Sequence, residues 1–338
     1  MALFIIRKLL LFAVVIVGVS VITFFLSTVV PGDPVRLALG QFATHEQVEE
    51  YRRELGLDQP VYKQYAHYAG RLLQGDLGVS IHTGFPVKSD ISKFFAATFE
   101  LTTISMIVAL LIGLPLGVLS AVYRDSLLDH AARIISLSGV SMPVFWLGLL
   151  LQLIFAVWLG VAPIGGRVSS QVSAAHPLKS ITGLFLIDSI LTGNWPFLLD
   201  FLKHLALPAA TLAYSSLVII TRMTRANMLE VLRQDYVRTA DVYGLPRHKV
   251  IGKYALKNAL ISTVTIVGLA YGMALSGTFL VETIFSWPGL GRYAASSIIN
   301  SDYPAVMGTT LLVALIYTVL NLLVDLVYTI LDPRISYR

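Results

Sequence analysis

Six apolar stretches separated by polar segments run through the chain, and each has about the length that a membrane-spanning helix needs. They are Leu9–Val30, Leu101–Tyr123, Ile134–Val161, His204–Thr221, Asn258–Val281 and Ala305–Leu331. Pro143 interrupts the third stretch, and the short fourth stretch contains Pro208. Such residues are tolerated in membrane helices because neighbouring helices satisfy the freed backbone groups. The pattern therefore predicts an all-α membrane protein with six spans.

The first stretch follows Arg7 and Lys8 and contains no charged residue. A secretory leader has an apolar core of about 7–15 residues that ends at small residues. Leu9–Val30 is longer and runs into Pro31-Gly32-Asp33-Pro34 without a site of that kind. We therefore expect a retained first span.

Two polar segments are predicted on the outer side of the membrane. Pro31–Lys93 is expected to form a small subdomain with short surface helices at Gln47–Leu55 and Val61–Leu73. Within Ala162–Lys203, the apolar part Ile181–Leu199 is interrupted by polar residues, so it has no charge-free run of the ~18 residues that a span needs. We expect an interfacial or periplasmic helix there.

The charges predict the orientation. Segments 1–8, 123–133, 222–258 and 332–338 hold 14 Lys and Arg against six Asp and Glu, whereas the segments on the other side hold 11 against 13. Loops rich in Lys and Arg remain in the cytoplasm. We therefore expect a multi-pass protein of a bacterial inner membrane with both termini in the cytoplasm.

The loop between the fourth and fifth spans is the most basic segment of the chain. It holds eight of the 25 Lys and Arg residues, namely Arg222, Arg225, Arg233, Arg238, Arg247, Lys249, Lys253 and Lys257. Apolar residues within it recur at steps of three or four and predict a helix over Ala226–Tyr243. The residues placed on one face of that helix are Leu229, Leu232, Tyr236, Ala240 and Tyr243.

The predicted helix ends at Gly244, because glycine is the usual residue after a helix C-terminus and Pro246 cannot continue the preceding turn. A second helix is expected from about Pro246 into the fifth span. The result would be a helix, a tight corner and a returning helix, suited to docking into another protein. A basic amphipathic helix lying on anionic lipid headgroups is the alternative.

The composition excludes a soluble domain, because 56% of the residues are hydrophobic and 13% are charged, against about 25% charged in soluble proteins. The chain has no cysteine, and its seven histidines are scattered over different loops. Neither G-x-x-x-x-G-K-[ST] nor H-E-x-x-H occurs. We therefore expect no catalytic residue, metal or cofactor in this chain. The net charge of +5 follows from topology and implies no nucleic-acid partner.

One carboxylate, Asp325, lies well inside a predicted span, one turn after Asn321. An acid inside the membrane is a candidate functional residue. The alternative is that Asp325 lies near the cytoplasmic end and pairs with a loop cation. A proton-driven carrier would usually have a relay of such groups.

The basic loop carries a motif. Arg238-Thr239-Ala240-Asp241-Val242-Tyr243-Gly244 resembles the E-A-A-x3-G signature of binding-protein-dependent ABC importer permeases. Arg-Thr-Ala stands in place of Glu-Ala-Ala, and this departure is similar to the peptide/nickel branch of that family. Asp235–Leu245 and Tyr254–Leu260 resemble the same branch.

Seven further stretches resemble that branch in the same order along the chain. They are Phe25–Arg36, Glu54–Asp58, Gly75–Ser80, Ser141–Trp146, Arg222–Arg225, Glu282–Arg292 and Asn321–Arg334. Gly166–Ser169 and Pro177–Asp188 are similar to the dipeptide permeases within it. The resemblance implies a type I (MetI-like) permease core.

The resemblance also implies a role for the basic loop, as the coupling helix that sits in a groove of a separate ATPase subunit. The residues assigned to this contact are Asp235, Tyr236, Arg238, Thr239, Ala240, Gly244, Leu245 and Pro246. The implied partners are a second, homologous permease, two ATPase subunits that bind ATP and Mg, a periplasmic peptide-binding protein and the lipid bilayer.

A second candidate site is the outer loop with Glu282, Trp287, Pro288 and Gly289. These residues are interpreted either as a periplasmic gate or binding-protein contact, or as a structural turn. The domains expected are 1–95 with the first span and a periplasmic subdomain, 96–331 as the permease domain with coupling loop 222–258, and 332–338 as a cytoplasmic tail.

The expected function is import of dipeptides or short peptides, driven by ATP hydrolysis in other subunits. Alternative cargoes on the same architecture are oligopeptides, glutathione, antimicrobial peptides, nickel complexes and haem. A self-sufficient secondary transporter is the alternative from another class.

Overall fold

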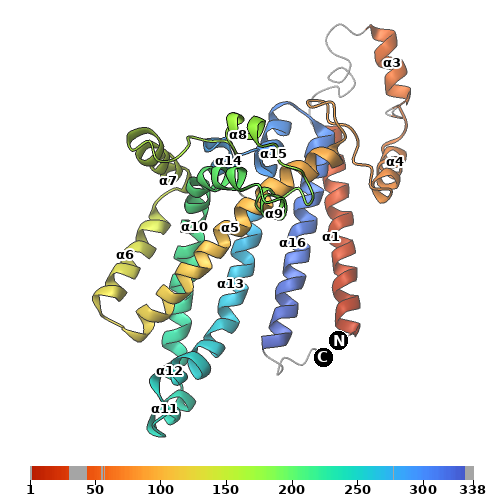
Figure 1. The fold of residues 1–338 in the computed structure, drawn as a ribbon. Coiled ribbons are helices and arrows are strands. Elements are labelled where there is room, and N and C mark those ends of the chain that lie inside the picture. Colours follow the sequence, from red (N-terminus) through yellow and green to blue (C-terminus); the bar gives the residue numbers. More distant parts are fainter. Residues whose placement is uncertain (1, 30–43, 55, 57, 277, 332–338) are drawn as a thin grey trace. The chain divides into compact units, whose positions relative to one another are not determined.

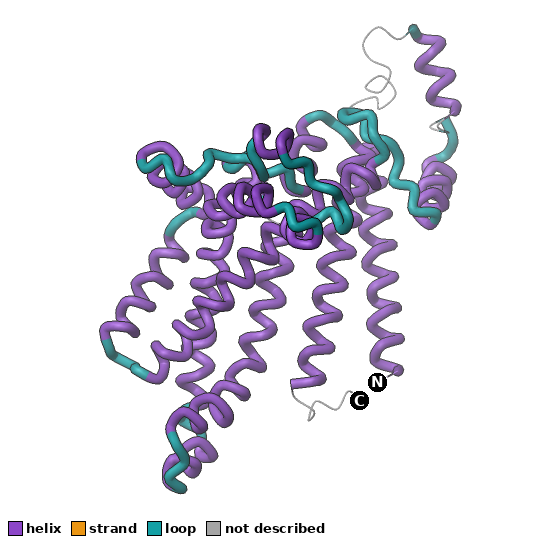
Figure 2. The backbone as a smooth tube through the Cα atoms, in the orientation of Figure 1, coloured by secondary structure: helices purple, strands orange, loops and turns teal. Residues whose placement is uncertain are grey.

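The computed structural model describes residues 2–29, 44–54, 56, 58–276 and 278–331. Throughout this described part the regular structure is helical, and the only pairing between extended segments is an isolated bridge between Val79 and Pro86 (Figure 2). The all-α fold is confirmed. The predicted end of the first span at Val30, residues 30–36 of the Phe25–Arg36 motif, residues 55 and 57 of the Glu54–Asp58 motif, and the tail 332–338 lie outside the described residues.

Five helical stretches of the described chain are long and apolar enough to cross a membrane, and a bent pair brings the number to six if it counts as one span. The five comprise α1 (Ala2–Val29), α5 (Val87–Val122), α10 (Trp195–Val231), the run from α12 (Arg247–Lys249) through η2 (Val250–Leu256) into α13 (Lys257–Ser276), and α16 (Tyr303–Leu331). They correspond to five of the six predicted spans.

The third predicted span is not one helix. It consists of α6 (Leu127–Ser141), α7 (Val144–Leu151) and the π-helix η1 (Gln152–Trp158), and the chain bends by 105° between Gly139 and Val144. Met142 is extended, with ψ 119°, and Pro143 is the N-cap of α7. A residue before proline is sterically driven out of the helical region, so Pro143 ends α6 and starts a helix in a new direction.

The fourth predicted span, His204–Thr221, is too short. α10 begins after Asn194, whose side chain accepts a hydrogen bond from the backbone of Phe197, and it continues through Pro208 to Val231. Its 37 residues correspond to about 56 Å, well above the ~30 Å hydrocarbon core of a bilayer. α10 therefore reaches beyond the membrane, and the first part of the basic loop is its continuation.

The chain divides into two compact units, Met1–Phe95 with Leu290–Thr318, and Ala96–Gly289 with Val319–Arg338. In the first unit, α3 (His45–Glu54) and α4 (Val61–Leu73) confirm the two predicted surface helices. α4 packs on α1 through Tyr68, which stacks on Phe24 with ring centroids 5.6 Å apart. The first unit also contains α15 (Leu290–Ile299). The domain limits 1–95, 96–331 and 332–338 stay a prediction.

The second unit has α10 at its centre, beside α5, α6 and α13 (Figure 1). At one end of this group lie α7 and three short helices, α8 (Ser170–Ala175), α9 (Phe185–Leu191) and α14 (Phe279–Ile284). Their core is aromatic, with Phe197, Phe201, Phe285 and Trp287 all buried. At the other end α10 leads into α11 (Asp235–Val242) and α12. The segment Ile181–Leu199 is therefore not a span: it contains α9, a turn and the start of α10.

Candidate functional site

The basic loop forms a compact elbow, by which we mean residues Leu232–Leu256. α10 ends at Val231, the backbone N–H groups of Arg233 and Gln234 bond back to Glu230 and Val231, and α11 starts after Gln234, whose backbone is extended. The single helix predicted over Ala226–Tyr243 is therefore wrong. It is interrupted at residues 232–234, and α11 is a separate helix of two turns.

The interruption changes which residues face inward. Val237 and Ala240 are buried and pack against Val250, with Leu245 at the edge of the same cluster. Tyr236 and Tyr243, which one continuous helix would place beside Ala240, are 43% and 81% exposed. The break shifts the helical phase, so Val237 takes the inward position that the sequence pattern assigned to Tyr236.

The corner after α11 is a Schellman motif. The N–H of Leu245 bonds to the carbonyl of Ala240 at 3.2 Å, and the N–H of Gly244 bonds to the carbonyl of Asp241 at 3.0 Å. Gly244 has φ +72°, a conformation that side chains with a Cβ disfavour. Pro246 follows as the N-cap of α12. The predicted roles of Gly244 as the turn and Ala240 as a close-packed residue agree with this geometry.

The elbow is joined to the start of α13 by a side-chain hydrogen bond. Asn258 donates from Nδ2 to the hydroxyl of Tyr236 at 2.9 Å and to the carbonyl of Tyr254 at the same distance. Between them lies the π-helix η2, which includes buried Val250 and Ala255. π-helical turns are rare and frequently occur at functional sites. The elbow thus contacts the ends of both α10 and α13.

The outward surface of the elbow combines apolar and basic residues. Val242 is 82% exposed beside Tyr236 and Tyr243, and the basic residues Arg238, Arg247, Lys249 and Lys253 are exposed around them. Of the eight residues predicted to contact an ATPase, Asp235, Tyr236, Arg238, Thr239, Gly244 and Pro246 are exposed, Leu245 is half-buried and Ala240 is buried. The arrangement offers an exposed apolar surface surrounded mainly by basic residues, which is suited to contact with another protein.

The outer loop predicted as a second site is folded into the core of its unit. Glu282 and Trp287 are fully buried, and Gly289 is also buried. The carboxylate of Glu282 accepts hydrogen bonds of 2.6 Å from Thr98 and Thr278, and the indole N–H of Trp287 donates to the carbonyl of Ala97 at 3.0 Å. A Cβ at Gly289 would lie 2.2 Å from the carboxyl carbon of Glu282. These contacts favour the structural turn, while the role as a gate stays a prediction.

A buried ion pair near this loop was missed by the sequence reasoning. Arg167 donates from a guanidinium nitrogen to a carboxylate oxygen of Glu100 at 2.5 Å, and the backbone N–H of Leu186 donates to the other oxygen at 2.6 Å. The guanidinium lies 3.6 Å from the ring centroid of Phe185. The pair joins α5 to the segment before α8. Its signal in the sequence was weak: Arg167 stands in a quoted motif, but Glu100 directly precedes an apolar stretch.

One further candidate from the sequence, Asp325, can be placed. Asp325 lies half-buried on α16, and its role stays a prediction. In the part of the chain that the structure describes, no three His, Asp or Glu side chains come together as a possible metal site.

The sequence was compared with known proteins. Residues 113–337 match the family described as "Binding-protein-dependent transport system inner membrane component", and residues 1–102 match its N-terminal family. The chain is 47% identical over 322 residues to the probable D,D-dipeptide transport system permease protein DdpB of Escherichia coli K12, with 95% of this chain and 94% of the relative covered. It is 43% identical to the dipeptide transport system permease protein DppB of the same strain, with 99% of each chain covered.

A more distant relative is the oligopeptide transport system permease protein AppB of Bacillus subtilis, at 37% identity over 338 residues and the whole of both chains. Family matches cover most of the residues, and the relatives match over nearly their full length. This chain belongs to the binding-protein-dependent transport system inner membrane components, the multi-pass permease subunits of ABC importers.

Proposed function

We propose that this chain is one of two permease subunits of an ATP-driven importer of dipeptides. The observation that carries the proposal is the elbow, a rigid exposed surface that contacts the ends of both α10 and α13. The names of the relatives at 43% and 47% identity support dipeptides as the cargo. The relative at 37% identity makes oligopeptides the second candidate.

The need for ATPase partners follows from the absence of an ATP-binding motif in the sequence. The chain has no phosphate-binding loop, so the energy of ATP has to arrive through contact with two separate ATPase subunits. The elbow is the surface we assign to that contact. A second, homologous permease would complete the pathway, and a periplasmic binding protein would deliver the peptide. ATP and Mg would bind in the ATPase subunits.

The mechanism is rigid-body movement. When the ATPase subunits close, a partner groove displaces the elbow, and the elbow carries α10 and α13 with it because Val237, Ala240 and Val250 pack it against the end of α10. Movement of packed helices against one another then opens the pathway to one side at a time. The chain itself performs no covalent chemistry.

The orientation follows from the same assignment. Since the ATPase subunits work in the cytoplasm, the elbow and both termini lie there, and α7–α9 and α14 lie on the periplasmic side. The chain has no cysteine, so a single Tyr243→Cys substitution gives one exposed thiol on the elbow. In cells that express the chain without the ATPase subunits, which would otherwise cover this position, an impermeant maleimide should label it in inside-out vesicles and not in intact spheroplasts; the reverse would place the elbow in the periplasm.

The deciding experiment is transport by the purified complex in proteoliposomes. We expect the chain to co-purify with an ATPase subunit and radiolabelled alanyl-alanine to accumulate only with ATP and the binding protein. Uptake by the chain alone would show a secondary transporter. Uptake of labelled D-alanyl-D-alanine and of a labelled pentapeptide, measured in the same way, distinguishes the D,D-dipeptide, dipeptide and oligopeptide cargoes, and absence of uptake of all three peptides would reject a peptide substrate.

A further inference from the structure

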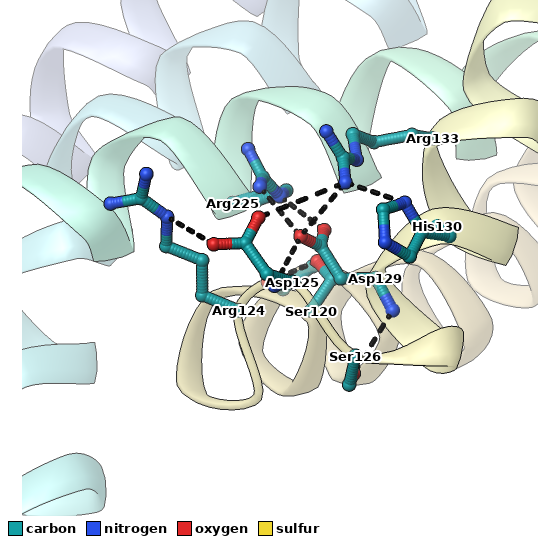
Figure 3. A network of polar contacts seen from close by, with 9 residues as sticks. Ser120, Arg124, Asp125, Ser126, Asp129, His130, Arg133 and Arg225 are labelled. Carbon is teal, nitrogen blue, oxygen red and sulfur yellow. Dashed lines mark hydrogen bonds and ion pairs between the residues drawn. The ribbon is translucent and has the colours of Figure 1, made fainter.

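A buried ion pair links the turn between α5 and α6 to α10, outside the elbow. Arg225 on α10 donates from Nε and from a terminal guanidinium nitrogen to the two carboxylate oxygens of Asp129, at 2.7 and 2.9 Å (Figure 3). The side chain of Asp129 is 0% exposed and that of Arg225 is 21% exposed. A two-point contact between a guanidinium and a carboxylate fixes orientation as well as distance.

Asp129 is also fixed to its own segment. It lies in the first turn of α6, where its backbone N–H donates to the N-cap Ser126, and its carboxylate accepts from the backbone N–H of Asp125 at 3.0 Å. Arg133, one turn further along α6, approaches the same carboxylate at 3.7 Å. A negative charge at a helix N-terminus is favourable. The start of α6 and the preceding turn are therefore held together around one buried carboxylate, which Arg225 connects to α10.

α6 contacts the same side of α10 a second time. The hydroxyl of Tyr214 lies 2.7 Å from that of Ser138. A Cβ at Gly139 would lie 2.3 Å from a methyl group of Val218. Tyr214, Val218 and Arg225 are four and then seven residues apart, so they share one face of α10. The two helices are thus joined at both ends of their contact, by an apolar close approach and by the ion pair.

The ion pair is close to the elbow along α10. Val231, six residues after Arg225, packs with the elbow residues Val237 and Val250, which corresponds to about 9 Å along the helix axis. Any displacement of the elbow that moves the end of α10 therefore reaches Arg225 within less than two helical turns. Without Arg225, α6 would keep its contacts with α10 near Tyr214 and Val218 but would lose the ion pair at its start.

We propose that Asp129 and Arg225 are positioning residues for energy coupling: their buried ion pair makes α6 move with α10 when an ATPase displaces the elbow. The inference rests on the proposed function, because it needs a partner that moves the elbow. It assigns a role to Arg225, which the sequence analysis noted only as a basic residue of the loop and as part of a motif, and to Asp129, which the sequence analysis did not single out. Loss of the pair lets α10 move without α6, so that ATP is hydrolysed without opening the pathway.

The test uses the whole importer complex in proteoliposomes and measures ATP hydrolysed per labelled dipeptide imported. Asp129→Asn keeps the size of the side chain but removes its charge, and we expect this ratio to rise about tenfold, within the range of coupling between distant sites. Asp125→Asn is the matched control, because the Asp125 side chain is 66% exposed and forms its ion pairs with Arg124 and Arg133, which are themselves exposed. Its ratio should equal that of the wild type.

A second variant separates coupling from folding. Because the chain has no cysteine, the double variant Asp129→Cys/Arg225→Cys provides the only two thiols of this chain, which a short bis-maleimide can join. We expect the unlinked complex to be uncoupled and the linked complex to return to within about twofold of the wild-type ratio, since the link replaces the connection without the charge. Each single-cysteine variant, treated in the same way, controls for reaction elsewhere.

The outcomes are distinguishable. A wild-type ratio in Asp129→Asn, or an uncoupled complex after cross-linking, would overturn the role of the ion pair. A wild-type complex that imports no dipeptide with ATP would instead reject the proposed function and leave the ion pair without a movement to transmit.

Discussion

The side-chain amide of Asn258, at the start of α13, donates a hydrogen bond of 2.9 Å to the hydroxyl of Tyr236 on α11. The two residues are 22 positions apart and stand on either side of the elbow's corner. The bond connects α11 directly to the start of α13, so that α11, η2 and α13 are held together by side-chain contact as well as through the chain. Tyr236 is thereby placed for two roles: its hydroxyl joins the elbow to α13, while its side chain is 43% exposed and available to the proposed ATPase contact.

The two roles of Tyr236 can be separated by substitution. Tyr236→Phe removes only the hydroxyl, and a hydrogen bond of this kind contributes about 0.5–1.5 kcal/mol. We expect Tyr236→Phe and Asn258→Ala to raise the ATP-to-dipeptide ratio by about the same factor, roughly threefold to tenfold. The measurement is the coupled assay in proteoliposomes.

Tyr236→Ala also removes the ring, so it should in addition weaken co-purification of the ATPase subunits, because aromatic residues carry much of the binding energy of interfaces. Equal effects of Tyr236→Phe and Tyr236→Ala on co-purification would contradict a docking role for the ring. Tyr62→Ala is the comparison variant: it removes an exposed ring on α4, outside the elbow, and should leave co-purification of the ATPase subunits unchanged.

Substitutions at Gly244 test the corner itself. A Cβ there would meet nothing within 4 Å, so only the backbone conformation at φ +72° opposes a side chain. A left-handed conformation costs roughly 1–2 kcal/mol for ordinary residues, and Asn tolerates it better. We expect Gly244→Asn to stay close to wild type and Gly244→Val to uncouple ATP hydrolysis from uptake, with Gly244→Asp between them, while the permease still assembles in part.

This order of severity, with Gly244→Asn the mildest and Gly244→Val the most severe, is expected only if backbone strain at residue 244 causes the loss. If Gly244→Asn were as severe as Gly244→Val, the loss would come from a clash with the ATPase groove rather than from the corner. Wild-type uptake by Gly244→Val would refute the role of the glycine. Detergent extraction and size-exclusion chromatography of each complex show whether the subunits remain assembled.

The sequence predicted the spans and the corner well because each rests on a local signal. Apolar runs of about 20 residues identify membrane helices, and Gly244 with Pro246 marks a helix end and a new start. The direction change at Pro143 was visible only as a proline, because the 105° angle depends on the packing of α7 against other helices. Local signals therefore predicted elements but not their directions.

The break at residues 232–234 had no comparable signal. Leu232, Arg233 and Gln234 are all good helix formers, so propensity predicted continuity. Burial of Val237, Ala240 and Val250 in one cluster decided the phase instead. The ion pair of Asp129 with Arg225 also had no local signal, because the two residues are 96 positions apart and meet only in the folded unit. Long-range pairs of this kind cannot be read from one sequence without knowing which helices are neighbours.

Asp188 provides a prediction for the dependence on pH. Its carboxylate is buried and accepts hydrogen bonds from the hydroxyl of Thr182 and the backbone N–H groups of Ile181, Thr182 and Gly183. Burial raises the pKa of Asp188, but these hydrogen bonds outweigh it and hold the pKa below its usual value. They favour the charged form, which is present above the ordinary aspartate pKa of about 3.9.

The direction of the pH dependence follows from the depressed pKa of Asp188. Because the folded pKa of Asp188 is depressed, its contribution to stability is complete above about pH 4–5 and is lost as the pH falls through the folded pKa. We expect the wild-type complex to melt at a higher temperature than Asp188→Asn at neutral pH, and the difference to shrink below about pH 4. A difference that stays constant down to pH 3 would show that the charge of Asp188 does not stabilise the loop.

Substitutions at Trp287 distinguish the two interpretations of the outer loop, as a structural turn or as a gate or binding-protein contact. Its indole is fully buried, donates to the carbonyl of Ala97 and lies 6.0 Å from the ring of Phe201. Replacing a buried tryptophan with alanine costs about 3–5 kcal/mol because a cavity remains. We therefore expect Trp287→Ala to prevent assembly at 37 °C and Trp287→Phe, which loses the hydrogen bond and some volume, to lower the melting temperature by a few degrees.

The affinity of the complex for the binding protein should be unchanged in Trp287→Phe, since a side chain without exposed surface offers no contact. Pro288, the half-buried neighbour, is the matched position, and Pro288→Ala tests whether the surface of the same turn takes part. If Trp287→Phe weakened binding of the binding protein while the melting temperature stayed that of the wild type, the turn would have to open during transport. The loop would then act as a gate, and the burial of Glu282 and Trp287 would describe its closed state.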